Sequence, residues 1–312
     1  MSDESYHVPV LLRETVDLLL NPEISKHIIV DGTLGGGGYT EEICRKISDD
    51  SRVIGIDKDV NALEFSSKRL KKFGDKVVLK KGNFAEVKSI LQGLGISSIT
   101  GIVLDLGLSS FQLESEEGFS FMKDTRLDMR ADKDLELTAA NVLNKYSEDE
   151  LNSIFVNYGE IGNSGRLVDA IIKQRSKEKF EYTNQLIKLI ESEYIIDKKN
   201  KIKFLAKIFQ SLRIEVNGEL NDLKKVLTDS TELLEKGGRI AIVSYHSLED
   251  RIVKDFFKEN SYTEKVSKYK LGIEVKTPLL KLVNKKVVVP TYEEVKSNSR
   301  ARSAKLRVAE KN

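Results

Sequence analysis

Three short apolar runs, each closed by an aspartate, constrain the fold of this 312-residue chain more than any other feature. They are residues 27–32 (HIIVDG), 52–57 (RVIGID) and 101–107 (GIVLDLG). Continuous apolar runs bounded by glycine or polar residues are typical of buried parallel strands. Helical patterns at 40–47 and 60–73 lie between them, with a further strand expected at 76–81. The alternation predicts βαβ units in a doubly wound α/β sheet.

The alternation stops after Ser110, and residues 137–208 show only helical patterns. A helix, a Lys-Gly-Gly turn, a strand and another helix are then expected over 219–257. An inserted α-helical domain explains this order, because insertions are tolerated where chain ends lie close. We predict one α/β sheet domain in two parts, residues 1–118 and 209–312, with a helical insertion at 119–208 between them and a basic C-terminal segment at the end of the second part. Two independent domains in series would leave the sheet short of strands.

A glycine-rich segment, residues 31–39 (DGTLGGGGY), joins a predicted strand to a predicted helix. Glycine has no Cβ and tolerates positive φ, so such a loop lets a ligand approach the backbone closely. The dinucleotide fingerprint requires a third glycine three residues after the second, where this chain has Thr40 or Glu41. A flexible turn would also explain the segment taken alone.

Asp31, Asp57 and Asp105 each end a predicted strand. The carboxyl ends of parallel strands meet at the ligand-binding edge of a sheet, so the three carboxylates are expected to converge. Their mutual repulsion favours a cationic ligand, and Asp57 lies where an acidic residue commonly binds ribose hydroxyls. S-adenosylmethionine, with an ammonium and a sulfonium charge, fits this pattern, whereas the pyrophosphate of NAD does not. Each aspartate taken singly is also explained as a helix N-cap.

Further polar and aromatic groups follow the same strands. Phe84 is placed either against adenine or in the core, and residues 109–112 (Ser-Ser-Phe-Gln) follow Asp105. His246 lies in the segment 244–251 (SYHSLEDR), where Ser247 with Asp250 or Glu249 is typical of a helix cap. A single histidine is more often structural than catalytic, and the absence of G-x-S-x-G argues against a hydrolase.

The charge of the chain is uneven. Residues 262–312 carry thirteen Lys/Arg and five Asp/Glu, a net charge of +8, against +2 for the whole chain. A basic segment suits a polyanion, because each phosphate contact releases condensed counterions. Arg300, Arg302 and Arg307 are candidates for contacts with the backbone of a nucleic acid such as RNA, although a solvated lysine-rich tail explains the charge equally well.

A second candidate RNA surface is the block 118–130 (GFSFMKDTRLDMR). It combines aromatic rings suited to stacking with basic side chains suited to phosphate contacts, namely Phe119, Phe121, Lys123, Arg126 and Arg130. The alternative is a loop that packs the inserted domain onto the sheet.

Cysteine content and hydropathy narrow the setting. One cysteine, Cys44, excludes an internal disulfide framework and a cysteine-based zinc cluster, and no metal site is predicted. The first residues do not have the pattern of a signal peptide, and no run approaches the roughly 18 apolar residues of a membrane span. A cytoplasmic protein is expected, without a membrane partner.

Several blocks, taken in order, resemble the RsmH (MraW) family of bacterial 16S rRNA cytosine-N4 methyltransferases. The resemblance runs from HVPVLL at His7 to RARSAKLRVAE, which ends at Glu310. Its blocks are DGTLGGGGY, GIDKD, LDLGLSSFQL, GFSFMKDTRLDMR, FQSLRIEVNGEL and GGRIAIVSYHSLEDRIVK.

The resemblance implies a class I (Rossmann-like) methyltransferase sheet with an inserted α-helical domain, and S-adenosyl-L-methionine as cofactor. It implies methylation of the exocyclic N4 of one cytidine in the decoding region of 16S ribosomal RNA, within an assembled or nearly assembled small subunit. Carried over by motif, the cofactor contacts fall on Gly37, Gly38, Tyr39, Asp57, Phe84, Asp105 and Gln112.

Two positions depart from the family pattern, which typically has His where Tyr39 stands and Pro where Phe111 stands. A contact made by the backbone N–H of Tyr39 would survive the change, and one made by an imidazole nitrogen would not. Asp105 is placed to accept a hydrogen bond from N4–H as a catalytic group, or only to hold the cofactor. Ser109, Ser110 or His246 are candidates to assist it.

Two rival functions remain distinguishable. A nicotinamide-dependent oxidoreductase would be stabilised by NAD rather than by S-adenosylhomocysteine in a thermal-shift comparison. A non-catalytic RNA-binding assembly factor would share the basic segment and the helical insertion. It would not need the glycine loop together with all three strand-end aspartates, and it would incorporate no methyl group into small subunits.

Overall fold

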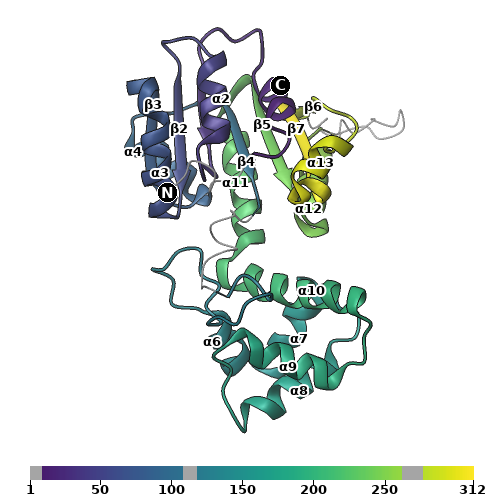
Figure 1. The fold of residues 1–312 in the computed structure, drawn as a ribbon. Helices are drawn as coiled ribbons and strands as arrows, with labels where there is room; N and C mark the ends of the chain where they lie inside the picture. The colour runs from purple at the N-terminus through teal and green to yellow at the C-terminus, as the bar shows by residue number, and fades with distance from the viewer. Residues whose placement is uncertain (1–8, 108–117, 262–276) are drawn as a thin grey trace, which may run out of the picture. The chain divides into compact units, whose positions relative to one another are not determined.

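The computed structural model describes residues 9–107, 118–261 and 277–312. The chain forms two compact units, one made of Met1–Gly107 with Leu220–Asn312 and the other of Leu108–Glu219 (Figure 1). The boundaries predicted for the insertion, 119 and 208, fall inside the second unit. The later boundary lies in the middle of helix α10 (Lys198–Asn217), which ends only at Gly218 in the left-handed conformation.

A seven-stranded sheet forms the centre of the first unit, in the order β3-β2-β1-β4-β5-β7-β6 (Figure 1). Strands β1 to β5 run parallel to one another, whereas β7 runs antiparallel to β5 and β6. The strands are β1 (Ile28–Asp31), β2 (Arg52–Asp57), β3 (Val77–Lys81), β4 (Ile99–Asp105), β5 (Leu234–Ser244), β6 (Leu280–Leu282) and β7 (Lys305–Lys311). The predicted doubly wound α/β sheet is confirmed.

Helices cover both faces of this sheet, so its strands need apolar side chains on both sides. Ile29 packs with helices α1 (Leu12–Leu19) and α2 (Gly38–Lys46) on one face. Its neighbour Val30 packs on the other face, as the alternation of side chains along a strand requires. The helices of that face are α4 (Val87–Gly93), α11 (Glu219–Leu233) and α12 (Ser247–Ser261).

Helix α3 (Val60–Leu70) joins β2 to β3 and begins where Asp59 accepts a hydrogen bond from the Asn61 N–H at 2.8 Å. The predicted helix extended to residue 73, but residues Lys71–Lys76 form a 3-10 helix instead. Gly74 within it has a φ of +53°, which interrupts regular helical geometry.

The Lys-Gly-Gly turn predicted before the fifth strand lies within the strand instead. Ile99 of β4 pairs with Leu234 of β5, but Gly101 pairs with Arg239, so β5 holds extra residues at this point. Such a bulge needs an unusual backbone, and Gly237 supplies a φ of +81°.

The basic C-terminal segment is not a solvated tail where the structure describes it. Strand β7 lies between β5 and β6, with Leu306, Val308 and Ala309 buried in the core. Its neighbour β5 contributes Arg239, whose Nε lies 3.0 Å from Glu310 Oε2 across the two strands. Before β7 come α13 (Tyr292–Ser297) and a 3-10 helix at Ser299–Ser303.

The second unit is helical and has its own apolar core. Its helices α6 (Ala139–Lys145), α7 (Glu148–Asn157), α8 (Gly165–Arg175), α9 (Thr183–Glu193) and α10 enclose buried residues such as Phe155, Leu167 and Leu186. Polar side chains fix where these helices begin, since Thr138 and Ser147 form capping boxes with Asn141 and Glu150.

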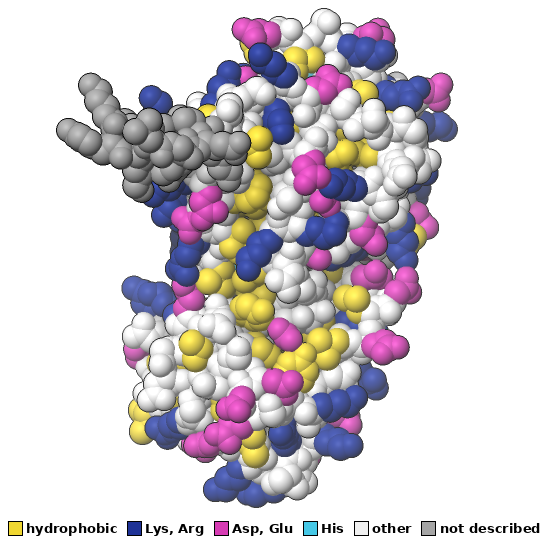
Figure 2. Space-filling model, turned by 180° about the vertical axis from the view of Figure 1, so that it is seen from behind, with side chains coloured by type: hydrophobic (Ala, Val, Ile, Leu, Met, Phe, Trp, Pro, Cys, Tyr) yellow, Lys and Arg dark blue, Asp and Glu magenta, His cyan; other side chains and the backbone are white. Residues whose placement is uncertain are grey.

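On the face seen in Figure 2, Lys and Arg side chains lie among Asp and Glu side chains. None of the helices that the structure describes has the length and apolar character needed to cross a membrane.

Candidate active site

The glycine-rich loop between β1 and α2 needs its glycines for backbone geometry. Gly35 and Gly37 have φ of +48° and +74°, which side chains rarely tolerate. Gly38 opens α2, and a Cβ placed on it would lie 2.2 Å from Cγ of Pro9. The loop is therefore a close-packed turn that only glycine permits at these positions.

Hydrogen bonds hold this loop from the side of helix α3. Ser66 Oγ donates to the Gly35 carbonyl at 2.6 Å, and Arg69 Nη1 donates to the Gly36 carbonyl at 3.0 Å. The Gly37 N–H donates to the Leu34 carbonyl at 2.7 Å, so it is used within the loop. The backbone facing a ligand is thus fixed in advance.

Tyr39, a predicted cofactor contact, points its side chain into the core. The ring is buried, and its hydroxyl donates a hydrogen bond to the Val10 carbonyl. Gly38 and Tyr39 are the first two residues of α2, whose N–H groups have no acceptor within the helix. A ligand contact by Tyr39 must therefore use its backbone, which is the kind of contact that survives replacement of a histidine.

The three strand-end aspartates lie at one edge, because β1, β2 and β4 are parallel neighbours. Asp31 is fully buried and accepts hydrogen bonds from the Thr40 hydroxyl at 2.7 Å and from the Thr33 N–H at 3.4 Å. Burial raises its pKa to about 6, and repulsion from Asp57 adds to the shift, against the hydrogen bonds that lower it.

Asp57 closes the loop from the end of β2. Its carboxylate accepts hydrogen bonds from the Gly35 N–H at 2.7 Å and the Asp59 N–H at 2.9 Å. Burial raises its pKa, although both N–H groups favour the charged form. A carboxylate has about four lone-pair sites, so these two bonds leave acceptor capacity for ligand hydroxyls.

Asp105 ends β4 and joins three elements. Its backbone N–H donates to Thr33 Oγ1 at 2.6 Å, and its Oδ1 accepts a hydrogen bond from the Tyr245 hydroxyl at 2.8 Å. Burial raises its pKa to about 7. The bond from Tyr245 lowers it, and repulsion from Asp31 and Glu249 raises it again.

The three carboxylates lie close enough to affect one another's pKa values, as their predicted convergence requires. Asp31 repels both Asp57 and Asp105, and burial disfavours all three charges. A bound cation would relieve this repulsion, because an opposite charge nearby favours the ionised carboxylate.

Phe84 lies at the start of a 3-10 helix after β3, half-buried against the core. A Cβ placed on Gly32 would be 3.1 Å from Cβ of Phe84, so the Phe84 side chain begins close to the β1 end of the loop. Lys58 Nζ lies 5.8 Å from the ring centroid. Both of the predicted settings, core and ligand wall, are compatible with this place.

Glu249 takes part in the start of helix α12, as the predicted cap in the segment 244–251 allowed. Glu249 Oε2 accepts hydrogen bonds from the backbone N–H groups of Tyr245 at 2.9 Å and His246 at 3.3 Å. His246 Nε2 lies 3.0 Å from Glu249 Oε1, without hydrogen-bond geometry. His246 is thus tied to the helix start.

The structure gives Arg307 a partner within the protein. Arg307 Nε lies 2.7 Å from Asp250 Oδ1, and Lys305 Nζ lies 3.0 Å from Asp250 Oδ2. The hypothesis that Arg307 contacts RNA is therefore weakened, because its guanidinium already ties β7 to α12.

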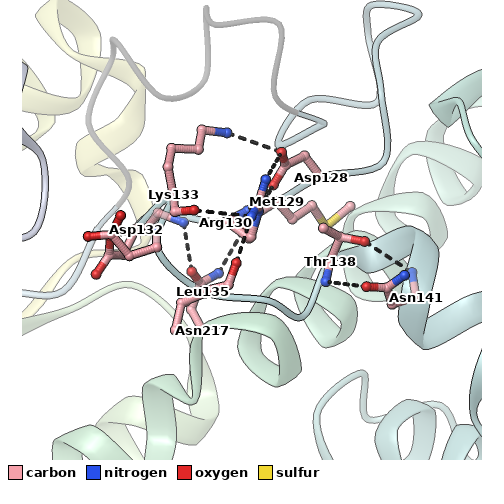
Figure 3. Close-up of polar contacts among 11 residues, drawn as sticks. Asp128, Met129, Arg130, Asp132, Lys133, Leu135, Thr138, Asn141 and Asn217 are labelled. Atoms are coloured by element: carbon pink, nitrogen blue, oxygen red, sulfur yellow. Dashed lines mark hydrogen bonds and ion pairs between the residues drawn. The ribbon is translucent and has the colours of Figure 1, made fainter.

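The aromatic and basic strip at 118–130 belongs in part to the core of the helical unit. Phe119 is buried, and the Phe121 ring packs edge-on against Phe209 at a centroid distance of 5.5 Å. Arg130 is held by both Asp128 oxygens at 2.7 and 3.0 Å and by the Leu135 carbonyl at 2.6 Å (Figure 3). Phe119, Phe121 and Arg130 therefore have structural partners within the helical unit, which weakens the hypothesis that they stack on RNA bases or contact phosphates.

Four predicted site positions, Ser109, Ser110, Phe111 and Gln112, lie outside the described residues, as does His7. The contact that the sequence did not reveal is the bond from Tyr245 to Asp105. The two residues are 140 positions apart, and only the adjacency of β4 and β5 brings them together.

Known proteins resemble the chain along its whole length. The family model of the MraW methylase family matches residues 4–312. The protein named ribosomal RNA small subunit methyltransferase H of Carboxydothermus hydrogenoformans is 44% identical, covering 99% of this chain and 98% of its own. The protein of the same name from Dictyoglomus thermophilum is 43% identical, covering 99% and 97%. A solved rRNA methylase of Streptococcus thermophilus aligns over 98% of both chains with 12% identity and a TM-score of 0.42. On the match across residues 4–312 and these identities, the chain belongs to the MraW methylase family.

Proposed function

We propose that this protein is an S-adenosylmethionine-dependent methyltransferase that methylates the exocyclic N4 of a cytidine in the decoding region of 16S ribosomal RNA. The names of its relatives support the small-subunit RNA as substrate. The observation that carries the proposal is the meeting of three carboxylates, Asp31, Asp57 and Asp105, around a fixed glycine loop.

The loop side of the site fits the amino-acid end and the ribose of the cofactor. The N–H groups of Gly38 and Tyr39 at the start of α2 would hold its carboxylate, since a helix N-terminus favours an anion. Asp57, with acceptor capacity left beyond Gly35 and Asp59, would hold the ribose hydroxyls. Phe84 would lie along the adenine.

The carboxylate side fits the positive charges. Asp31 is fully buried, so it would act on the ammonium and the sulfonium through space. Asp105 lies at the open end of β4, where part of the residue reaches solvent. When bound, S-adenosylmethionine supplies the methyl group as an electrophile on a positively charged sulfur, which leaves as a neutral thioether with the bonding pair.

Asp105 would serve the substrate amine. The N4 of cytosine is a weak nucleophile because its lone pair is delocalised into the ring, and it becomes positively charged as its bond to the methyl carbon forms. Asp105 would accept a hydrogen bond from N4–H and then the proton that N4 loses. A pKa of about 7 suits this task, because a base works best when its pKa is near the working pH.

The cytidine must leave its stack to reach such a site. The proposed partner is a small subunit, assembled or nearly so, whose RNA presents the cytidine as an unstacked base. Base stacking and phosphate contacts are the usual means by which proteins hold such bases.

The proposal is tested by incubating the protein with small subunits from cells that lack this methylation and with cofactor labelled in its methyl group. Mass mapping should place the label on N4 of a single cytidine of the decoding region. Absence of label, or label on carbon or on another base, overturns the proposal. Asp105→Asn should lower turnover at saturating cofactor at least a hundredfold, as removal of general base catalysis typically does. Unchanged turnover would assign Asp105 to cofactor binding alone.

A further inference from the structure

The Tyr245 side chain meets Asp105 because of the order of the strands. Asp105 pairs with Val243 in the parallel ladder of β4 and β5, and the Leu106 N–H donates to the Val243 carbonyl at 2.9 Å. Gly107 and Tyr245 follow these paired residues by two positions, just beyond the ends of β4 and β5, and therefore lie side by side. The phenol ring reaches back over the end of β4 to Oδ1 of Asp105 at 2.8 Å.

Gly107 provides the space for this ring. A Cβ placed on Gly107 would lie 2.8 Å from Cε2 of Tyr245 and 3.2 Å from its Cδ2. Those distances are too short for an unmoved ring, so even alanine at position 107 would displace the phenol. From the other side, the Tyr245 N–H is held by Glu249 Oε2 at 2.9 Å. The hydroxyl is thus directed at Asp105 by contacts on both sides.

From this geometry we propose that Tyr245 is a positioning residue for the methyl transfer, one that fixes the Asp105 carboxylate with Oδ2 left for the substrate amine. The inference rests on the proposed function of the site. Among the residues that the structure describes, Asp105 Oδ2 accepts no hydrogen bond, whereas Oδ1 is occupied by Tyr245.

The hydrogen bond from Tyr245 favours the ionised form of Asp105, which the rest of its surroundings disfavour. Asp31 of β1 and Glu249 of α12 are the anionic groups that act on it, and the Tyr39 hydroxyl of α2 lies within electrostatic range. Tyr245 opposes the effect of burial and of both carboxylates by donating to the ionised form. Burial and the charge of Asp105 raise the pKa of Tyr245 far above its usual value, so its hydroxyl remains a donor at all working pH values.

The test is a carboxyl-carbon NMR titration of Asp105 in the cofactor-free protein, with its resonance identified by comparison with Asp105→Asn. In Tyr245→Phe we expect the pKa of Asp105 to rise by about one to two units, because the ionised carboxylate loses the hydrogen bond that favours it. Tyr146→Phe is the matched control, because the Tyr146 hydroxyl also donates to a carboxylate, Glu215, at 2.8 Å but in the helical unit. It should leave the Asp105 titration unchanged.

Gly107→Ala keeps the hydroxyl but displaces the ring, and it should shift the Asp105 titration in the same direction. Gly107→Ala replaces Tyr245→Phe as the test variant if Tyr245→Phe does not fold. An Asp105 titration that is the same in wild type and in both variants, or one that Tyr146→Phe shifts as much, overturns the inference.

The rate of methyl transfer provides the second readout. In Tyr245→Phe the acidic limb of the kcat–pH curve should move toward alkaline pH by a similar amount, with the rate at pH 9 restored. A uniform loss of rate at all pH values would show a merely structural role. The NMR titration does not require activity, so the two proposals can fail separately. Failure of the labelling experiment would refute the proposed function alone. An Asp105 pKa that is unchanged in Tyr245→Phe and Gly107→Ala would refute only the role of Tyr245.

Discussion

At the scale of single residues, the site depends on carboxylates whose charge the fold disfavours. Asp31 and Asp105, with pKa values of about 6 and 7, are placed where neither gains a salt-bridge partner among the described residues. A folded protein seldom buries carboxylates without a partner, because desolvation of a charge is costly. The burial of Asp31 and Asp105 is explained if a cationic ligand binds beside them.

The first prediction concerns ligand charge. As the pH falls from 8 to 5.5, Asp105 and then Asp31 become protonated and lose their attraction for a sulfonium. The affinity for S-adenosylmethionine should therefore fall about tenfold more than the affinity for S-adenosylhomocysteine, whose sulfur is neutral. Calorimetric titrations of both ligands at several pH values measure this ratio. A ratio independent of pH would contradict the electrostatic account.

The second prediction concerns stability. The folded-state pKa of Asp105 is raised, so the folded state holds its proton over a pH range where the unfolded chain has lost it. The contribution of Asp105 to the free energy of unfolding should therefore decline as the pH rises from about 4 to 7, with the cost complete above that range. Asp105→Asn removes the cost and should stabilise the ligand-free protein at pH 8 by on the order of 1–3 kcal/mol, and by less at pH 5.

Urea unfolding at the two pH values gives both free energies. Asp59→Asn is a suitable control, because it removes a nearby negative charge while its amide oxygen can still accept the hydrogen bond that caps helix α3, so it should change the free energy of unfolding little at either pH. A gain from Asp105→Asn that is equal at pH 5 and pH 8 would count against the burial of an unfavourable charge.

At the scale of elements, β7 is a strand that the basic charge of its segment concealed in the sequence. Its residues Lys305–Lys311 alternate, with Leu306 and Val308 buried and Lys305 and Arg307 partly exposed. This period of two is a strand signal. It was obscured because its alternating basic residues suggested a tail. By contrast, β1, β2 and β4 were predictable, since both of their faces are covered and their runs are continuously apolar.

The third prediction tests the link from β7 to α12. Asp250 is mostly buried and pairs with both Arg307 and Lys305. Arg307→Gln and Asp250→Asn should each lower the free energy of unfolding by about 1–3 kcal/mol, and the double variant by less than the sum. Urea unfolding of the four proteins forms the cycle. If Arg307 acted on RNA instead, Asp250→Asn would free it and strengthen RNA binding without a loss of stability.

The same lesson applies to the site. Asp57 and Asp105 were predictable because a strand end and a sheet edge place them, whatever else the chain does. The partner of Asp105 was not, because strand order decides which of the later strands lies beside β4, and that order is a property of packing. The partners of Arg130 could not be predicted for a similar reason, since its contacts with Asp128 and Leu135 depend on the fold of one irregular loop.

At the scale of the whole molecule, two cores share one chain. The sheet unit carries the glycine loop and all three aspartates, and the helical unit has a separate apolar core that includes Phe155 and Phe180. Units with independent cores need not unfold together.

The fourth prediction follows from this division. Differential scanning calorimetry should resolve two transitions, and S-adenosylhomocysteine should raise the temperature of only one of them. Leu167→Ala, in the helical core, should lower the other, since truncating a buried leucine costs about 2–5 kcal/mol. A single transition that both changes shift equally would mean that the cores unfold as one.

The place of β7 also has a consequence for the nascent chain. The strand that fills the slot between β5 and β6 is made after both of them, so the sheet stays open on the ribosome until residues 305–311 have left the exit tunnel. Until then the unpaired edge of β5, with its apolar Ile240 and Ile242, is available to other strands, so this is the stage of synthesis at which the sheet is most exposed to aggregation.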